Sequence, residues 1–149
     1  MTEPLRLSWE VDCSPSVAFR LWTERTDLWW PAGHSASREK GAAIVFEPRV
    51  QGRIYERDPT GAEKDWGTVL YWDPPHRLIY RWHIFSEPKD ATEVEVHFRA
   101  NPDGTTTVSI EHRGWDAFDD GAERRDNNEA GWRGLIPPYV GACNTSYAY

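Results

Sequence analysis

The chain has 149 residues, with 17 Lys and Arg against 24 Asp and Glu, which gives a formal net charge of −7. This length predicts one domain over residues 1–149, and the acidic balance repels nucleic-acid phosphates, so no nucleic-acid partner is expected. No run approaches the roughly 18 apolar residues of a membrane span, and the first residues lack a signal-peptide pattern. A cytoplasmic location without a membrane span is therefore expected.

Cofactor and metal motifs are missing from the sequence. The histidines at 34, 76, 83, 97 and 112 do not have metal-ligand spacing, and there is no glycine-rich phosphate loop or nucleophile motif. Cys13 and Cys143 form neither a disulfide framework nor a thiolate metal site. We expect no cofactor, no metal and two reduced packing cysteines.

The first elements are a strand and a short helix. Residues 5–11 alternate apolar and polar side chains, which predicts a half-buried strand. Ser14 as the cap and Pro15 at the first helical position then start an amphipathic helix. Trp29 and Trp30 follow, and since neighbouring residues cannot face the same way, one indole is expected inside and the other at the rim.

Residues 42–112 show only strand and turn signals. Turn residues at 58–61, 73–75 and 101–104 separate the strands. The six predicted strands fall within residues 42–50, 52–57, 64–75, 77–85, 92–100 and 105–115.

The last hairpin allows a register prediction. Its apolar sets share a face only if residue 94 faces 112, 96 faces 110 and 98 faces 108, with a loop over 101–105. This register turns His112 inward and places Glu93 opposite Arg113. It also places Glu95 directly opposite Glu111, and the repulsion between the two carboxylates destabilises this pairing.

A helix is predicted at the C-terminal end. Asp120 and Glu123 have capping-box spacing, and the helical pattern runs through Trp132, Leu135 and Ile136. Pro137 and Pro138 should kink or restart the helix. The elements together predict an α+β domain whose sheet buries one face against this helix, with a small-molecule site between them.

Several segments resemble one known family. "SPSVAFRLWTERTDLWWP", "IVFEPRVQGRIYE", "WGTVLYWDPPHRLIYRW", "TEVEVHF", "TTTVSIEHRGW" and "GWRGLI" are similar to successive signatures of the activator-of-Hsp90-ATPase-homologue-1-like proteins in the START-related (SRPBCC) superfamily. The resemblance implies a helix-grip fold, in which seven antiparallel strands wrap a long C-terminal helix around an apolar cavity. Two departures are Gln51-Gly52, where the family usually has two glycines, and the Pro137-Pro138 pair.

Inward positions on this fold define the expected ligand-binding residues. They are Trp29, Trp30, Phe46, Ile54, Glu56, Trp66, Tyr80, Trp82, Val96, Ile110, His112, Trp115, Trp132 and Ile136. Of these, His112, Tyr80 and Glu56 are candidates for acid–base catalysis. Alternatively, Glu56 is an exposed acid at a strand end and His112 is satisfied by backbone groups.

Three functions remain open at this point. The first is a binding protein for a small apolar or aromatic ligand, as a monomer or homodimer. The second is a cyclase or aromatase acting on a polyketide-like substrate. The third, suggested by the family name, is an Hsp90-type co-chaperone or stress-related interaction module.

Overall fold

The structure is a computed structural model that describes residues 2–31, 42–83 and 87–145. Within these residues, seven strands form one antiparallel sheet in the order β1-β7-β6-β5-β4-β3-β2. The strands are β1 (Leu5–Val11), β2 (Ala43–Phe46), β3 (Arg53–Arg57), β4 (Glu63–Asp73), β5 (Arg77–Trp82), β6 (Thr92–Ala100) and β7 (Thr106–Arg113).

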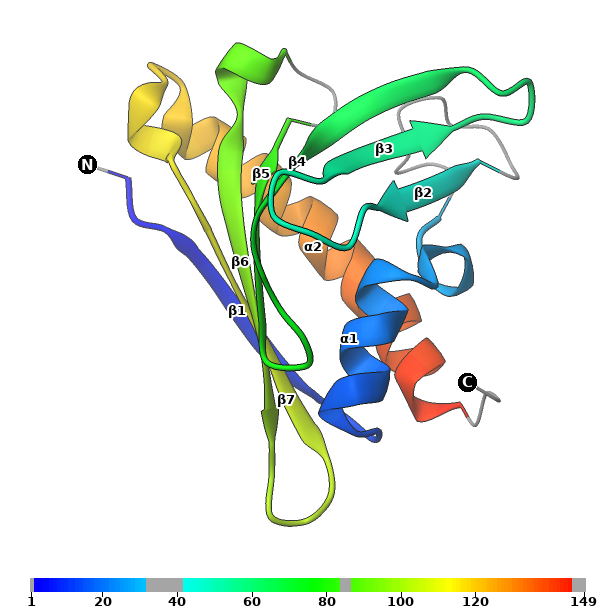
Figure 1. Ribbon diagram of the computed structural model, residues 1–149. Coiled ribbons are helices and arrows are strands. Elements are labelled where there is room, and N and C mark those ends of the chain that lie inside the picture. The colour runs from blue at the N-terminus through cyan, green and yellow to red at the C-terminus, as the bar shows by residue number, and fades with distance from the viewer. Residues whose placement is uncertain (1, 32–41, 84–86, 146–149) are drawn as a thin grey trace.

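Within the described residues, two α-helices lie on one face of this sheet, and three short 3₁₀ turns connect other elements. They are α1 (Pro15–Thr23), the short turns η1 (Thr26–Leu28), η3 (Pro88–Asp90) and η4 (Trp115–Ala117), and the long helix α2 (Gly121–Asn144). Figure 1 shows α2 running diagonally across the sheet, with α1 beside its C-terminal half. The predicted α+β architecture and the seven strands are confirmed.

The register of the last hairpin is the predicted one. Val94 pairs with His112, Val96 with Ile110 and Phe98 with Val108, and Ala100 pairs with Thr106 across the loop. Glu93 lies opposite Arg113, and Glu95 opposite Glu111. Apolar alternation therefore sets the face that each strand turns toward the helices.

The predicted capping box of α2 is wrong, and so is the alternative that the helix restarts at the prolines. Asp120 is the N-cap residue, but its side chain makes no capping hydrogen bond; its carboxylate accepts instead from Arg124 Nε at 2.7 Å. The helix also does not restart at the prolines, because one α-helix of 24 residues runs through Pro137 and Pro138. Pro137 and Pro138 lack backbone N–H donors. The buried side chains on either side of them, Leu135 and Tyr139, hold the helix against the sheet.

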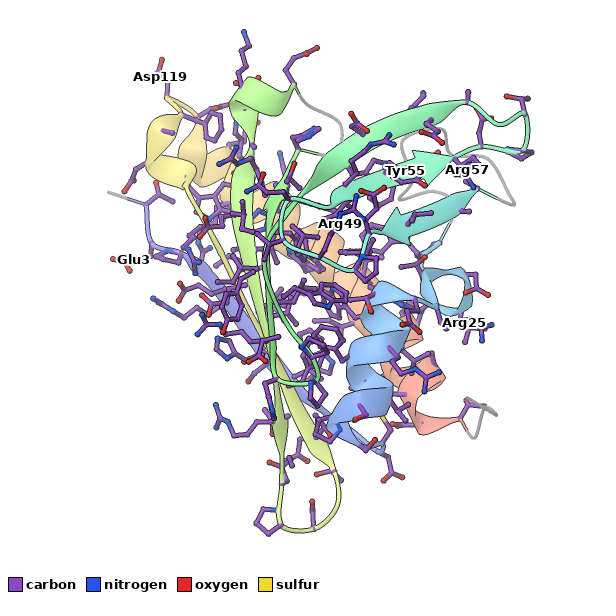
Figure 2. All side chains as sticks on the ribbon, in the orientation of Figure 1. Glu3, Arg25, Arg49, Tyr55, Arg57 and Asp119 are labelled. Carbon is purple, nitrogen blue, oxygen red and sulfur yellow. The ribbon has the colours of Figure 1, made fainter. Side chains whose placement is uncertain are left out.

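The core lies between the sheet and the two α-helices. In Figure 2 side chains crowd this space, whereas the labelled Glu3 and Asp119 project from the periphery. Of the helices in the described ranges, none is long and apolar enough to cross a membrane.

Candidate functional site

Five tryptophans form a closed circuit of ring contacts in the core. Their centroids are 5.2 Å apart for Trp22–Trp29, 5.3 Å for Trp29–Trp30, 6.0 Å for Trp30–Trp82, 6.4 Å for Trp82–Trp132 and 5.8 Å for Trp132–Trp22. We call these five residues the indole circuit. Offset and edge contacts of this kind add about 0.5–1.5 kcal/mol per pair beyond burial.

Four separate elements supply the indole circuit. Trp22 comes from the apolar face of α1, and Trp82 from the inner face of β5. Trp132 comes from α2, while Trp29 and Trp30 directly follow η1. Trp29 is buried and Trp30 only half-buried, so the two adjacent indoles divide between interior and rim.

A small hollow adjoins the indole circuit beside the edge strand β1. The residues around it are Trp9, Trp22, Trp29, Trp132, Leu135, Ile136 and Tyr139. This hollow has no space for a bound water molecule. A large preformed cavity is therefore not present among these seven residues, and the indoles pack on one another.

The indole N–H groups distinguish Trp9 from its neighbours. Trp29 donates to the carbonyl oxygen of Leu21 at 2.7 Å, and Trp115 donates to that of His112 at 2.8 Å. The N–H of Trp9 is buried and has no hydrogen-bond partner among the described residues. A buried donor left unpaired costs about 1–3 kcal/mol, and Trp9 is one of the residues around the hollow.

His112 contacts the Trp132 indole and is fully buried. Trp132 Nε1 donates to His112 Nδ1 at 3.1 Å, which leaves the ring proton on Nε2, 2.6 Å from Thr92 Oγ1. Burial lowers the pKa of His112 to about 3. This imidazole is neutral near pH 7 and has both nitrogens occupied, an arrangement that suits a structural role better than proton transfer.

Glu56 and Tyr80 are the other two acid–base candidates. Glu56 is buried, so the alternative of an exposed strand-end acid is wrong, and its Oε1 accepts from Trp66 Nε1 at 3.2 Å. Tyr80 is buried on β5, and burial raises the pKa of its phenol even though the Trp22 hydrogen bond opposes this. Tyr80 is thus a neutral hydroxyl, while Glu56 is a carboxyl group held inside the core.

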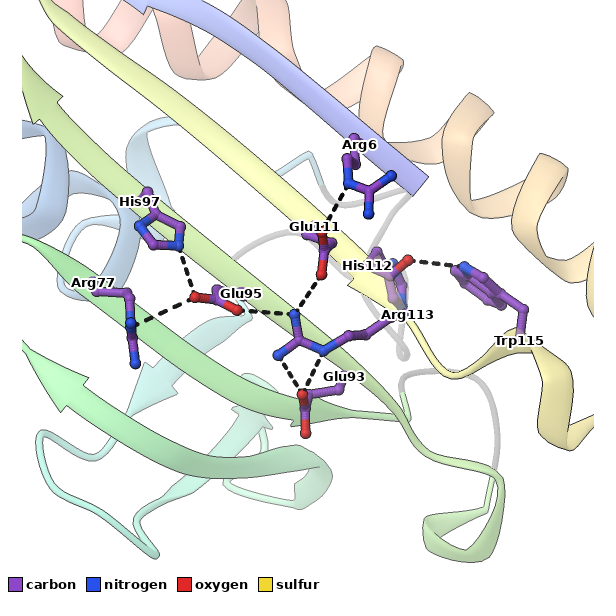
Figure 3. Close-up of polar contacts among 9 residues, drawn as sticks. All are labelled: Arg6, Arg77, Glu93, Glu95, His97, Glu111, His112, Arg113 and Trp115. Atoms are coloured by element: carbon purple, nitrogen blue, oxygen red, sulfur yellow. Dashed lines mark hydrogen bonds and ion pairs between the residues drawn. The ribbon is translucent and has the colours of Figure 1, made fainter. Parts of the chain in front are cut away.

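The outer face of the sheet carries a charged network instead of an apolar surface. Arg113 donates to Glu93, Glu95 and Glu111, at 2.7, 2.9 and 2.8 Å. Arg6 also reaches Glu111, and His97 and Arg77 reach Glu95 (Figure 3). Among the described residues, no group of three or more His, Cys, Asp or Glu side chains could hold a metal ion.

The predicted ligand residues divide into those near the hollow and those elsewhere. Trp29, Trp132 and Ile136 line it, and Trp30, Trp66 and Trp82 continue the aromatic contacts beyond it. The other predicted residues pack in the remaining core: Phe46, Ile54, Glu56, Tyr80, Val96, Ile110, His112 and Trp115.

Four residues that line the hollow were not predicted: Trp9, Trp22, Leu135 and Tyr139. Trp9 and Trp22 already showed the signal, because both lie on the apolar face of their elements. Tyr139 follows the two prolines, where the sequence suggested that the helix was interrupted.

Most of the chain matches the model of one protein family. The family model described as Activator of Hsp90 ATPase homolog 1-like protein matches residues 12–136. Among curated proteins no sequence matches.

Solved structures of similar proteins cover nearly the whole chain. The anthrahydroquino-gamma-pyrone synthase Txn09 is 33% identical over 95% of this chain and 97% of its own, with a TM-score of 0.63. The self-sacrificing resistance protein CalC from Micromonospora echinospora is 25% identical over 93% and 92%, with a TM-score of 0.68. Protein MLL2253 from Mesorhizobium loti is 18% identical over 93% and 95%, with a TM-score of 0.66, and shares the fold.

Proposed function

The chain belongs to the Activator of Hsp90 ATPase homolog 1-like family, and on that premise we propose that it binds a planar aromatic small molecule between α2 and the sheet. The observation that carries this proposal is Trp9, whose buried indole N–H lacks a partner beside a hollow walled by aromatic rings. A carbonyl or hydroxyl oxygen on the ligand accepts from this N–H. The rings of the ligand then stack on the neighbouring indoles.

Entry of the ligand requires the hollow to open, because its present volume is too small. Two pairs of indoles at the hollow are nearly parallel: Trp9–Trp22 at 23° and Trp22–Trp132 at 25°. A flat ring inserted between parallel indoles replaces each broken aromatic contact with a similar one. A flexible aliphatic chain makes no such replacement, so the site favours planar aromatic ligands.

The similar proteins support the same ligand class. Txn09 is named for an anthrahydroquino-gamma-pyrone, a fused planar aromatic compound. Most of the contacts in the hollow of this chain are aromatic, and the lining contains no charged side chain. An uncharged, fused aromatic ligand with one acceptor oxygen fits this lining best.

A fluorescence titration tests the proposal. A hydroxyanthraquinone should quench tryptophan emission saturably, and palmitate should not. Trp9→Phe removes the donor but keeps an aromatic ring, so it should weaken hydroxyanthraquinone binding by about 5–10-fold. Trp72→Phe is the matched control, since Trp72 does not line the hollow and contacts Phe19, and it should bind as the wild type does.

Two results would contradict the binding proposal. One is the absence of saturable quenching by any fused aromatic compound. The other is equal weakening by Trp9→Phe and Trp72→Phe, which would show that the indole N–H of Trp9 is not the contact that matters.

A second candidate function, a cyclase-type enzyme, is favoured by the identity to Txn09 together with Glu56. A carboxylate held in an apolar core can remove a proton next to a carbonyl group during ring closure. Glu56→Gln keeps the hydrogen bond from Trp66 but removes the base, so it should abolish turnover of a linear polyketide surrogate while leaving quenching intact. Absence of turnover by the wild type leaves binding as the function.

A further inference from the structure

The two cysteines meet although they lie near opposite ends of the chain. Cys13 follows β1, and Cys143 lies in the last turn of α2. The side chains of Cys13 and Cys143 interact with each other, and both cysteines are free. Their proximity cannot be read from either local sequence.

The backbone around this cysteine pair is held in place independently of the sulfurs. The backbone N–H of Asp12 donates to Asn144 Oδ1 at 2.8 Å, and Thr106 Oγ1 donates to the carbonyl oxygen of Cys13 at 2.6 Å. These contacts tie the residues beside both cysteines to one another and to β7. The two sulfurs therefore remain neighbours in the folded protein.

The two thiols differ in reactivity. Cys13 is partly exposed, and the hydrogen bond from Cys143 lowers its pKa, although burial and Asp12 oppose this. Cys143 is buried, and the contact with Cys13 together with burial raises its pKa. Since the thiolate is the nucleophile, Cys13 is the group that an oxidant meets first and Cys143 is the resolving thiol.

We propose that Cys13 and Cys143 form a reversible disulfide, a modification site that joins the end of α2 to the segment between β1 and α1. With oxidised glutathione as the oxidant, the Cys13 thiolate attacks one glutathione sulfur and releases one glutathione thiolate. The Cys143 thiol then loses its proton, attacks the Cys13 sulfur and releases the second glutathione. The protein loses two electrons and two protons, and the oxidant gains them.

The disulfide changes the stability of the whole chain because it closes a loop over nearly all of it. Cross-linking a loop of this length removes much of the entropy of the unfolded state, so the oxidised protein should melt roughly 5–15 °C higher than the reduced protein. The bond also restrains the last turns of α2. Tyr139, one turn before Cys143, donates to the carbonyl oxygen of Ala18 at 2.6 Å and lines the hollow.

The test uses the full chain equilibrated with oxidised and reduced glutathione at several ratios. On oxidation the intact mass should fall by about 2 Da, the two hydrogens lost, and non-reducing peptide mapping should recover the Cys13 peptide linked to the Cys143 peptide. The thermal midpoint should rise with the fraction oxidised, and dithiothreitol should reverse both changes. None of these measurements depends on a ligand.

Single variants separate the proposed bond from other oxidation. Cys13→Ser and Cys143→Ser should each show no rise in thermal midpoint with oxidised glutathione. Failure to detect the intramolecular link, even in oxidised glutathione alone, would overturn the proposal. So would a link that forms without raising the thermal midpoint, because the sulfurs would then be bridged only at the expense of the native packing.

Discussion

His112 shows how a single residue can be polar, buried and still fully satisfied. Its two nitrogens contact the Trp132 indole and the Thr92 hydroxyl, and the Trp115 ring lies against its ring at a tilt of 46°, with centroids 4.4 Å apart. Trp115 also donates to the carbonyl oxygen of His112 at 2.8 Å. The neutral imidazole thereby joins β6, β7, η4 and α2, and this arrangement depends on its remaining uncharged.

The stability of the protein should therefore fall as the pH decreases below about 6.5. The pKa of His112 drops from 6.5 to about 3 on folding, so between these values only the unfolded chain takes up the proton. Stability is fully present above pH 6.5 and decreases by roughly 1.4 kcal/mol per pH unit toward pH 3. Urea unfolding should give about 2 kcal/mol less stability at pH 5 than at pH 7.

Substitutions at two histidines test whether His112 causes this loss of stability at low pH. His112→Gln lowers overall stability but should flatten the pH dependence between 5 and 7, whereas His76→Gln, at an exposed position in the turn between β4 and β5, should keep it. An unchanged slope in His112→Gln would show that His112 is not the group responsible.

The turn between β2 and β3 depends on Gly52. A β-carbon at this position would lie 2.5 Å from the carbonyl oxygen of Glu47 and 2.8 Å from that of Arg49. Gly52→Ala should therefore destabilise the protein by about 1–3 kcal/mol, measured by urea unfolding. The neighbouring Gln51 has a φ of 68°, so Gln51→Gly relieves a strained backbone and should not destabilise. Equal losses in the two variants would contradict this account of the turn.

At the scale of elements, the outer face of β6 and β7 is stabilised by compensated charge. The pKa values of Glu95 and Glu111 are both lowered, although burial acts to raise them. The hydrogen bonds from Arg113 to both carboxylates outweigh the effect of burial, together with those from His97 to Glu95 and from Arg6 to Glu111. Arg113 thus offsets the repulsion between two carboxylates that the register places directly opposite each other. The same strand pairing that buries His112 creates the need for Arg113 outside.

Arg113→Gln should destabilise the protein by about 1–2 kcal/mol at pH 7. Because lowered carboxyl pKa values give stability that is present above about 4.5 and lost as the pH falls through the folded-state values, this deficit should shrink in acid. Arg6→Gln is the control, since the Arg6 side chain is largely exposed and, among the described residues of this face, forms an ion pair only with Glu111. It should cost less than about 0.5 kcal/mol in the same urea titration.

Across the whole molecule, the sequence predicts elements and faces better than it predicts contacts between elements. The alternation of apolar and polar residues correctly predicted that Val96 lies opposite Ile110 and that His112 faces inward. The adjacency of Trp29 and Trp30 correctly predicted that only one of the two indoles is buried. These outcomes depend on side-chain direction, which a strand or helix fixes locally. They needed no knowledge of how α2 crosses the sheet.

The candidate site was less predictable because it depends on that crossing. The hollow brings Trp9 of β1 together with Tyr139 of α2, and no periodicity encodes their meeting. The contact between Cys13 and Cys143 was not predicted, for the same reason. At Asp120 the sequence predicted a capping box, but the carboxylate binds the side chain of Arg124 instead.

We propose that a planar aromatic molecule binds at the Trp9 end of the hollow. The indole N–H signals in a ¹H–¹⁵N spectrum test this proposal most directly. On titration with a hydroxyanthraquinone, the Trp9 signal should move downfield as its N–H gains an acceptor, while Trp115, already bonded to His112, should stay in place. Binding that leaves the Trp9 signal unmoved, or that shifts Trp115 equally, would contradict the account.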